Sequence, residues 1–202
     1  MTEVLRAQFT LCGMRFYWLD CIGAVLGLLY LVLEYKANVW LWAVSIVMPV
    51  VHGYLYYVRG LYADCALDIY FVIAALYGWG VWLAGKRAND GVETPIVHAD
   101  TRRGITVAVV TVALWAVLRA WLVAFTDSTV PTLDAFTTAL SVTAMWALSR
   151  KWVEQWLMWL AVDAVSAALY VYKGIPFTAI LYAIYTVIAV VGYRRWRELA
   201  RT

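Results

Sequence analysis

The sequence has few charged residues. Asp, Glu, Lys and Arg make up 14% of its 202 residues, where an ordinary soluble domain has about 25%. Hydrophobic residues account for 65% of the chain, more apolar surface than a soluble globule could bury or a disordered chain would contain. The net charge is only +3, and no basic tract is available to bind nucleic acid. The composition therefore predicts an integral membrane protein whose surroundings are the lipid bilayer.

Cysteine and histidine are also scarce. Cys12, Cys21 and Cys65 have no CxxC spacing, and His52 and His98 lie 46 positions apart. The sequence therefore predicts no disulfide framework, no metal site and no cofactor. The catalytic patterns GxSxG, HExxH and the P-loop are absent as well, so we expect no enzymatic activity.

The sequence does contain apolar runs that suit a bilayer, which a helix of about 20 residues crosses. Seven runs meet or approach this length: residues 18–35, 39–58, 61–83, 104–125, 131–149, 153–172 and 176–193. Each run is apolar at both odd and even positions, unlike the alternating strands of a membrane barrel. No small-x-small cleavage site precedes the next polar break, so we expect the first run to be a retained helix. The predicted fold is all-α, with seven transmembrane helices in one membrane domain over residues 1–202.

The chain also repeats itself at a constant offset of 114 residues. The matched pairs are Trp42 and Trp156, Leu55-Tyr56 and Leu169-Tyr170, Arg59-Gly60 and Lys173-Gly174, Leu67 and Leu181, Ala75 and Ala189, Gly78 and Gly192, and Trp82 and Trp196. We interpret them as a duplication, with copies at about 18–83 and 131–196 and a linking helix at about 104–125. Equivalent positions are four helices apart, an even number, so the two three-helix repeats are expected to be parallel, with a site between them near the midplane.

Asp163 is the first candidate for a binding residue. It lies ten residues into the sixth run, near mid-bilayer, where a charge costs about 2.5–3.5 kcal/mol. Trp156 and Trp159 precede it by seven and four residues, on the same helical face. A carboxylate beneath two indoles suits a flat ring that is cationic or donates hydrogen bonds. The alternative is a structural aspartate bonded to neighbouring hydroxyls, with both tryptophans at the membrane interface.

Three further residues complete the candidate substrate-binding set. Asp68 lies about two turns into the third run; it either faces the same cavity or bonds a tyrosine hydroxyl, and the sequence leaves both possibilities open. Tyr70 flanks Asp68, and Trp42 is the counterpart of Trp156 in the first copy. Arg119 lies six residues from the end of the fourth run, so we expect its side chain to extend to the membrane interface.

The second copy resembles a known family. Its element Trp156-x-x-Trp159-x-x-x-Asp163, followed by Lys173-Gly174, is similar to the signature of the PnuC vitamin transporters. In the first copy, Tyr77-Gly78-Trp79 is similar to the third helix of that family. The resemblance covers residues 18–198 and implies a three-plus-one-plus-three fold like that of SWEET sugar transporters. It also implies a homotrimer of the bacterial inner membrane that carries an unphosphorylated vitamin by facilitated diffusion, which a cytoplasmic kinase then traps by phosphorylation.

Two positions depart from that family and bear on the cargo. Nicotinamide riboside carriers commonly have Asn where Asp163 stands and Gln where Asp68 stands, so this pocket is more acidic. Nicotinamide riboside is the expected cargo, and thiamin, which is also cationic, stays an open alternative. Riboflavin is uncharged and larger and fits least. A structural or assembly membrane protein, in which these residues only pack, is the alternative from another class.

The basic residues predict the orientation in the membrane. With seven helices, eleven Lys and Arg flank one side and four flank the other. The eleven are Lys36, Lys86, Arg87, Arg102, Arg103, Arg150, Lys151, Arg194, Arg195, Arg197 and Arg201, and the four are Arg6, Arg15, Arg59 and Lys173. Cytoplasmic flanks carry the excess of Lys and Arg. The N-terminus is therefore expected outside and the C-terminus in the cytoplasm.

This orientation can be tested with topology reporters. A reporter fused after Arg201 should indicate the cytoplasm, and one inserted in residues 127–130 should indicate the outside, because three predicted helices, an odd number, lie between the two insertion points. Finding both reporters on one side would contradict the seven-helix count.

Overall fold

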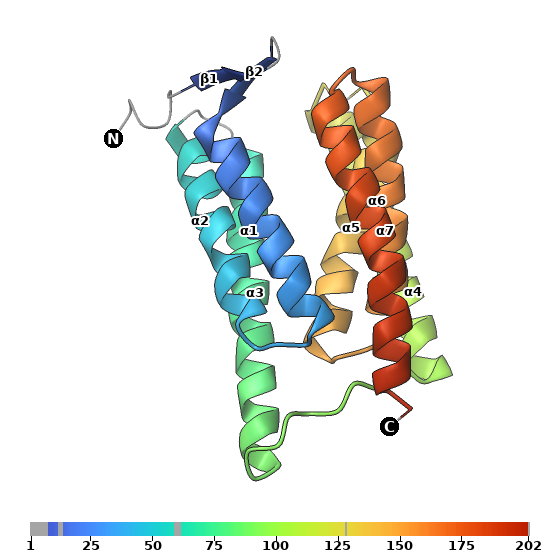
Figure 1. Cartoon of the computed structure of the whole chain (residues 1–202). Helices are drawn as coiled ribbons and strands as arrows, with labels where there is room; N and C mark the ends of the chain where they lie inside the picture. The colour runs from blue at the N-terminus through green and yellow to red at the C-terminus, as the bar shows by residue number, and fades with distance from the viewer. Residues whose placement is uncertain (1–7, 12–13, 59–61, 128, 202) are drawn as a thin grey trace. The chain divides into compact units, whose positions relative to one another are not determined.

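The computed structural model describes residues 8–11, 14–58, 62–127 and 129–201. Within these ranges it contains seven helices (Figure 1): α1 (Trp18–Tyr35), α2 (Leu41–Val58), α3 (Tyr62–Ala88), α4 (Thr101–Phe125), α5 (Pro131–Ser149), α6 (Gln155–Tyr172) and α7 (Pro176–Leu199). The predicted seven-helix, all-α membrane class is confirmed. α1 and α5 have the predicted bounds, whereas α3 and α7 continue five or six residues beyond their apolar runs, because a helix can project polar turns into water.

A short hairpin that the sequence analysis did not predict precedes α1. Strands β1 (Gln8–Leu11) and β2 (Met14–Tyr17) pair antiparallel, with Gln8 opposite Tyr17 and Leu11 opposite Met14. Four-residue strands are too short for their period to stand out in a sequence. Cys12, and the Arg59-Gly60 member of the predicted duplication, lie outside the described residues.

Helix ends follow from local chemistry. The Asp100 side chain accepts a hydrogen bond of 2.7 Å from the backbone N–H of Arg103 and so caps the start of α4. Pro131 and Pro176 stand at the first positions of α5 and α7, where a missing N–H costs nothing. Gly174, with φ of +70°, ends α6 in the left-handed conformation that glycine adopts most easily.

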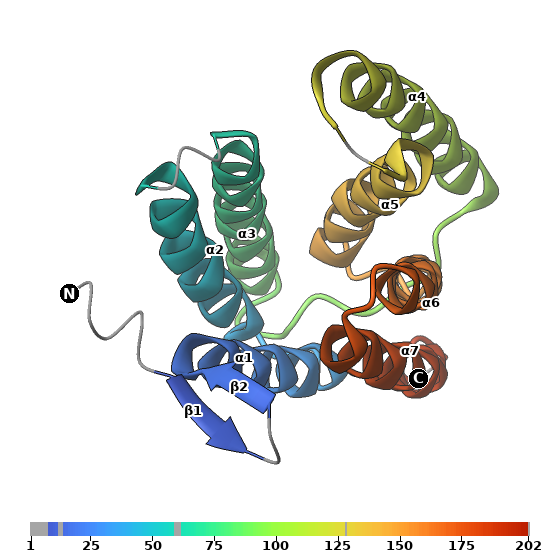
Figure 2. The same cartoon turned by 90° about the horizontal axis from the view of Figure 1, so that it is seen from above.

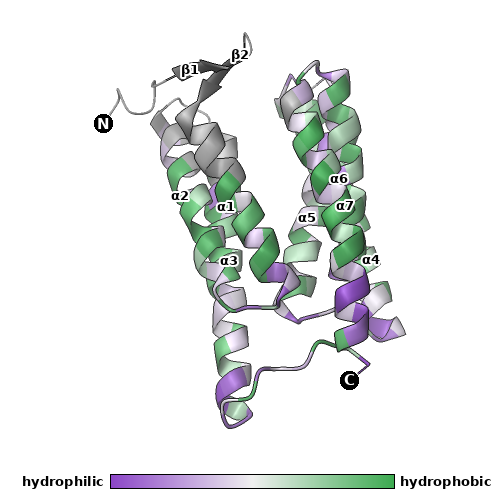
Figure 3. Ribbon diagram, in the orientation of Figure 1, coloured by the Kyte–Doolittle hydropathy of each residue, from purple (hydrophilic) through white to green (hydrophobic). Residues whose placement is uncertain are grey.

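The exposed surface of α4 is apolar. Thr111 is its one buried residue, whereas Val109 is 63% and Phe125 is 75% exposed. By length and composition, α4 and the segment Leu67–Ala88 of α3 can cross a membrane. Figure 3 shows polar residues gathered at the end of α3, at the start of α4 and at the end of α7. A helix that presents apolar side chains outward in this way is suited to contact with lipid.

The structure comprises two compact units, Met1–Trp79 and Gly80–Thr202, that divide within α3. In the first unit α1 packs against α2 (Figure 2). In the second, α4 packs against α5, α5 against α6 and α6 against α7. The single membrane domain and the parallel arrangement of the repeats stay predictions.

The turns between α1 and α2 and between α5 and α6 have the same backbone conformation. Ala37 (φ +50°) and Lys151 (φ +53°), 114 positions apart, both adopt the left-handed region that non-glycine residues rarely enter. Three backbone hydrogen bonds of the first turn have a counterpart in the second. The first turn has Ala37 N to Glu34 O (2.9 Å), Asn38 N to Leu33 O (2.8 Å) and Trp42 N to Val39 O (3.2 Å). The second has, in the same order, Lys151 N to Leu148 O (2.9 Å), Trp152 N to Ala147 O (3.1 Å) and Trp156 N to Val153 O (3.2 Å). Such agreement at the predicted offset supports the duplication.

A second correspondence involves the two helices after each turn. Trp42 and Trp156 are fully buried, and each indole lies against a glycine of the following helix. A Cβ added at Gly78 would collide with the Trp42 ring, and one added at Gly192 would lie 2.6 Å from Cε2 of Trp156. These contacts, again 114 positions apart, require a residue without a side chain.

This packing predicts the effect of single methyl groups. Gly78→Ala and Gly192→Ala should each lower stability by about 1–3 kcal/mol, because the methyl must displace a rigid ring. Gly80→Ala, where a Cβ meets nothing within 4 Å, is the matched control and should be neutral or stabilising, since alanine favours helix by about 1 kcal/mol over glycine. Thermal unfolding in detergent would measure the difference, and three equally stable variants would contradict the tight contact.

Candidate functional site

One face of α6 is buried although it is partly polar. Gln155, Trp156, Asp163 and Ser166 are buried on this face, and Trp159 is half-buried among them. At 3.6 residues per turn these five side chains fall within about 100° of one another around the helix axis. The predicted spacing of Trp156, Trp159 and Asp163 therefore does place them on one face.

Asp163 is the unusual member of this face. It is 7% exposed, and its carboxylate has no hydrogen bond or ion pair with any residue that the structure describes. A buried carboxylate is stable only when it is paired or hydrogen-bonded. The structural-aspartate alternative requires a neighbouring hydroxyl that donates to Asp163, and none of the described hydroxyls does so. Among the described residues the Asp163 carboxylate is thus unpaired, as a ligand-binding residue would be, and its role stays a prediction.

Tyrosines of α7 lie near this carboxylate. Tyr182 and Tyr185 are within electrostatic range of Asp163. The Tyr182 ring stacks on that of Tyr170 at 5.3 Å between centroids and meets Tyr185 edge-on at 5.7 Å. The site thus combines one carboxylate with a cluster of aromatic rings, which suits a flat ligand.

The sequence analysis did not assign these α7 tyrosines to the site, although a signal was present. The connection between α6 and α7 is short, so residues equally distant from Gly174 should face each other in an antiparallel helix pair. Trp156 and Gly192 are each 18 positions from Gly174, and the structure places them in contact. Asp163 and Tyr185 are each 11 positions away.

The two tryptophans of the predicted site differ in their surroundings. Trp156 is 1% exposed, lies against Gly192 and meets the ring of Trp196 edge-on at 5.9 Å. Trp159 is half-buried. The indole N–H groups of both, and the side-chain amide of the fully buried Gln155, have no hydrogen-bond partner among the described residues. Trp156 packs α6 against α7, so of the two indoles we expect Trp159 to be the one that stacks on a ligand.

The first unit contains the other three predicted site residues. Trp42 is buried against Gly78. Asp68 is half-buried. It faces α2, since a Cβ added at Gly53 of α2 would lie 3.4 Å from the Cβ of Asp68. Tyr70 meets the ring of Phe71 edge-on at 5.6 Å. Residues two apart on a helix point about 160° away from each other, so Asp68 and Tyr70 do not line one surface. Whether Asp68 shares a cavity with Asp163 stays a prediction.

Arg119 forms a specific contact in the second unit. Its Nε donates a hydrogen bond of 3.0 Å to Oγ1 of Thr132, in the first turn of α5. The side chain thus reaches the first turn of the next helix, and its predicted extension to the membrane interface stays a prediction. Among the described residues, no group of three His, Cys, Asp or Glu could hold a metal ion.

Comparison with known proteins gives a family and relatives. Residues 17–198 match the family described as nicotinamide mononucleotide transporter. The riboflavin/roseoflavin transporter RibM of Streptomyces davaonensis is 30% identical over 189 residues, which cover 93% of this chain and 88% of RibM. The nicotinamide riboside transporter PnuC of Escherichia coli is 25% identical over 213 residues, 94% of this chain and 89% of PnuC. PnuC of Haemophilus influenzae is 22% identical over 185 residues, 91% of this chain and 81% of that protein.

A solved structure is similar as well. The crystal structure of the vitamin B3 transporter PnuC matches with a TM-score of 0.71 at 24% identity, covering 91% of this chain and 82% of that chain. At this level of identity the likeness establishes a shared fold.

Substitutions on α6 should separate a ligand site from packing. With nicotinamide riboside as a flat cationic probe, Trp159→Ala should weaken binding about tenfold if this face is a ligand site, through loss of cation–π and contact energy. Asp163→Asn should weaken this cationic ligand several-fold and the uncharged nicotinamide less, because it removes the charge but keeps the shape. Asp134→Asn, which removes a carboxylate paired with Lys173 at 3.2 Å, is the control. Isothermal titration calorimetry in detergent would measure each affinity.

Unfolding midpoints must accompany these titrations, since loss of a packed indole also destabilises a helix bundle. If folded Trp156→Ala, Trp159→Ala and Asp163→Asn proteins all bind like the parent, the cargo site lies elsewhere.

Proposed function

Because the chain belongs to the nicotinamide mononucleotide transporter family, and its relatives are vitamin transporters rather than enzymes, we propose that its cargo is an unphosphorylated cationic vitamin, nicotinamide riboside. The observation that supports this cargo is the buried Asp163 carboxylate without a partner among the described residues. A pyridinium ring that enters the site compensates this charge. It also gains cation–π attraction from the ring of Trp159.

The same carboxylate argues against a phosphorylated cargo. A phosphate ester brings about 1.5–2 negative charges at neutral pH. Placed near Asp163, in surroundings of low dielectric, these charges repel the carboxylate strongly. We therefore propose that the riboside rather than the mononucleotide is carried, and that phosphorylation by a cytoplasmic kinase retains the product inside the cell.

Riboflavin is the second candidate, because RibM, a riboflavin/roseoflavin transporter, is 30% identical to this chain. The aromatic cluster of Tyr170, Tyr182 and Tyr185 offers surface for its larger ring system. Riboflavin carries no charge that would compensate Asp163, which places it behind nicotinamide riboside. Thiamin, with its cationic ring, satisfies Asp163 in the same way as nicotinamide riboside.

We also propose the arrangement in the membrane. The basic residues at the end of α3, the start of α4 and the end of α7 belong to the cytoplasmic side, with the C-terminus there and the N-terminus outside. The chain works as a homotrimer in the bacterial inner membrane and equilibrates its cargo by facilitated diffusion. Of the first-repeat candidates, we keep Asp68 as a proposed cargo residue, because Trp42 packs on Gly78 and Tyr70 lies on the other face of α3 from Asp68.

Proteoliposomes test the cargo and the mode of transport. Labelled nicotinamide riboside should equilibrate across the membrane without an ion gradient, and labelled nicotinamide mononucleotide should not enter. In competition, thiamin should inhibit uptake more than riboflavin, because it matches the charge of Asp163.

Liposomes with Asp163→Leu protein provide the control, since this variant lacks both charge and acceptor and should not transport. Accumulation above the outside concentration under an imposed proton or sodium gradient would contradict facilitated diffusion. Saturable uptake of riboflavin but not of nicotinamide riboside would overturn the proposed cargo.

A further inference from the structure

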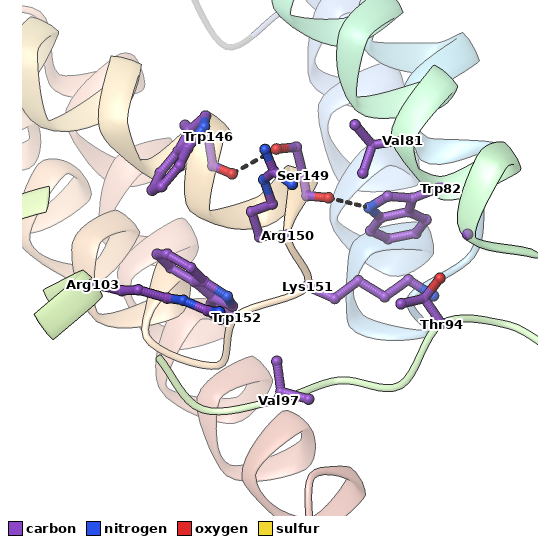
Figure 4. A pocket seen from close by; sticks show the side chains of 11 residues that line it. Val81, Trp82, Thr94, Val97, Arg103, Trp146, Ser149, Arg150, Lys151 and Trp152 are labelled. Atoms are coloured by element: carbon purple, nitrogen blue, oxygen red, sulfur yellow. Dashed lines mark hydrogen bonds between the residues drawn. The ribbon is translucent and has the colours of Figure 1, made fainter. Parts of the chain in front are cut away.

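A cavity at the basic end of the second unit contains none of the cargo-site residues. It lies between the last turns of α3, residues 94–103 and the α5–α6 turn, with a volume of about 420 Å³, within the range of small-molecule sites. Its lining includes three tryptophans and three cationic residues: Trp82, Trp146, Trp152, Arg103, Arg150 and Lys151. Figure 4 shows Trp146 and Trp152 on one side and Trp82 and Thr94 on the other, with Arg150 and Lys151 between them.

The walls of this cavity are fixed by hydrogen bonds. The connection between α3 and α4 docks on the α5–α6 turn: Val97 N–H donates to Lys151 O (3.1 Å), and Val153 N–H donates to Val97 O (3.0 Å). Glu154 accepts from the backbone N–H of Ala99 at 2.9 Å. From α3, the indole N–H of Trp82 donates to the carbonyl oxygen of Ser149 at 3.1 Å (Figure 4). The cavity is therefore formed before any ligand arrives.

The cationic groups of the cavity lie on its aromatic rings. The guanidinium carbon of Arg103 is 6.0 Å from the Trp152 ring centroid, and that of Arg150 is 5.7 Å from the Trp146 centroid. The two indoles meet edge-on at 5.0 Å. A guanidinium held against an indole keeps N–H donors for a phosphate, which it binds in bidentate fashion.

Lys151 is the buried cation of the set. Its side chain is 4% exposed, and its Nζ lies 4.3 Å from the Trp82 ring centroid and 3.4 Å from a carboxylate oxygen of Glu93. Burial lowers the pKa of Lys151, and the charge of Glu93 opposes this shift. Asp100, 3.2 Å from Arg103, and Glu154, 2.7 Å from His98, are the other carboxylates nearby, and Lys86 is a further cation close to Lys151. The residues that line the cavity itself include three cations and no carboxylate.

The equivalent turn of the first repeat shows that the fold does not require these residues. Ala37 and Asn38 occupy the positions of Lys151 and Trp152, with the same backbone hydrogen bonds and the same left-handed φ. An alanine therefore suffices to build this turn. The buried lysine and the indole beside it add a chemistry that the backbone alone does not explain.

We propose that this cavity is a second binding site, which takes a phosphate ester of a flat heteroaromatic compound. The ring would lie among the indoles of Trp82, Trp146 and Trp152, and the phosphate would be held by the guanidinium groups of Arg103 and Arg150. If the proposed function holds, the phosphorylated cargo is such an ester. The kinase product would then occupy the cytoplasmic end of its own transporter.

Occupancy should slow transport. A ligand between Trp82 and the α5–α6 turn ties the end of α3 to the start of α6. These two helices also carry Asp68 and Asp163, the acidic residues that we propose as cargo residues. A transporter that must rearrange these helices to pass its cargo would be held in one state by the ligand.

Direct binding tests the site separately from transport. Purified protein in nanodiscs of neutral phosphatidylcholine is titrated with nicotinamide mononucleotide and with flavin mononucleotide. At least one should bind, and Arg103→Gln combined with Arg150→Gln should weaken it about tenfold or more, because two charge-assisted bonds are lost. Both arginines are exposed, so the fold should persist. Arg194→Gln, on exposed α7 surface outside the cavity, is the matched control.

Asp163→Asn separates this site from the cargo site and should leave ester binding unchanged. Absence of binding by both esters, or loss of binding in Asp163→Asn but not in the double arginine variant, overturns the proposal. Nanodiscs that contain anionic phosphatidylglycerol identify a lipid as the occupant: if they abolish ester binding, the cavity holds a lipid headgroup and the proposal for a soluble ester fails. Flavin mononucleotide binding at the two arginines, without nicotinamide riboside transport, supports the site while the proposed cargo fails.

Discussion

The contact between an indole and a glycine determines how closely the helices of each repeat approach. Trp156 fills the space that a side chain at Gly192 would occupy, and Trp42 does the same at Gly78. In a bilayer, apolar side chains gain little by leaving lipid for one another, so close van der Waals contact at small residues holds helices together. This contact positions α6 against α7 and so brings Asp163 near the α7 tyrosines. The packing interaction and the proposed binding interaction thus share one helix face.

Much of the fold follows from the sequence, because lipid leaves the backbone few options. Long runs that are mostly apolar form helices in a bilayer, since every backbone N–H and C=O must be satisfied within the segment. The bounds of α1 and α5 follow from these runs alone, and the offset of 114 residues leads to the paired turns at Ala37 and Lys151. The polar ends of α3 and α7 and the β1–β2 hairpin do not follow, because water permits helix, strand and loop alike.

The candidate site was less accessible to sequence reasoning. Trp156, Trp159 and Asp163 could be placed on one face by helical spacing, but spacing does not show which indole packs and which stays available. That distinction depends on Gly192 in another helix. Tyr185 could have been found by counting from the α6–α7 turn. The docking of Val97 on the α5–α6 turn could not have been predicted, because no periodic sequence pattern indicates that a loop and a turn are joined by two backbone hydrogen bonds.

The two equivalent turns have consequences for the direction of transport. Their backbones agree, yet one turn carries Ala37 and Asn38 where the other carries Lys151 and Trp152. Because the two turns differ in their side chains, the two repeats need not change conformation at the same rate. A solute bound at one turn can then slow influx and efflux to different degrees. Detailed balance still forbids an uncoupled carrier from changing the final ratio of inside to outside cargo. Under the proposed facilitated diffusion, the asymmetry of the turns therefore allows kinetic control of uptake, and the proposed kinase sets the final ratio of inside to outside cargo.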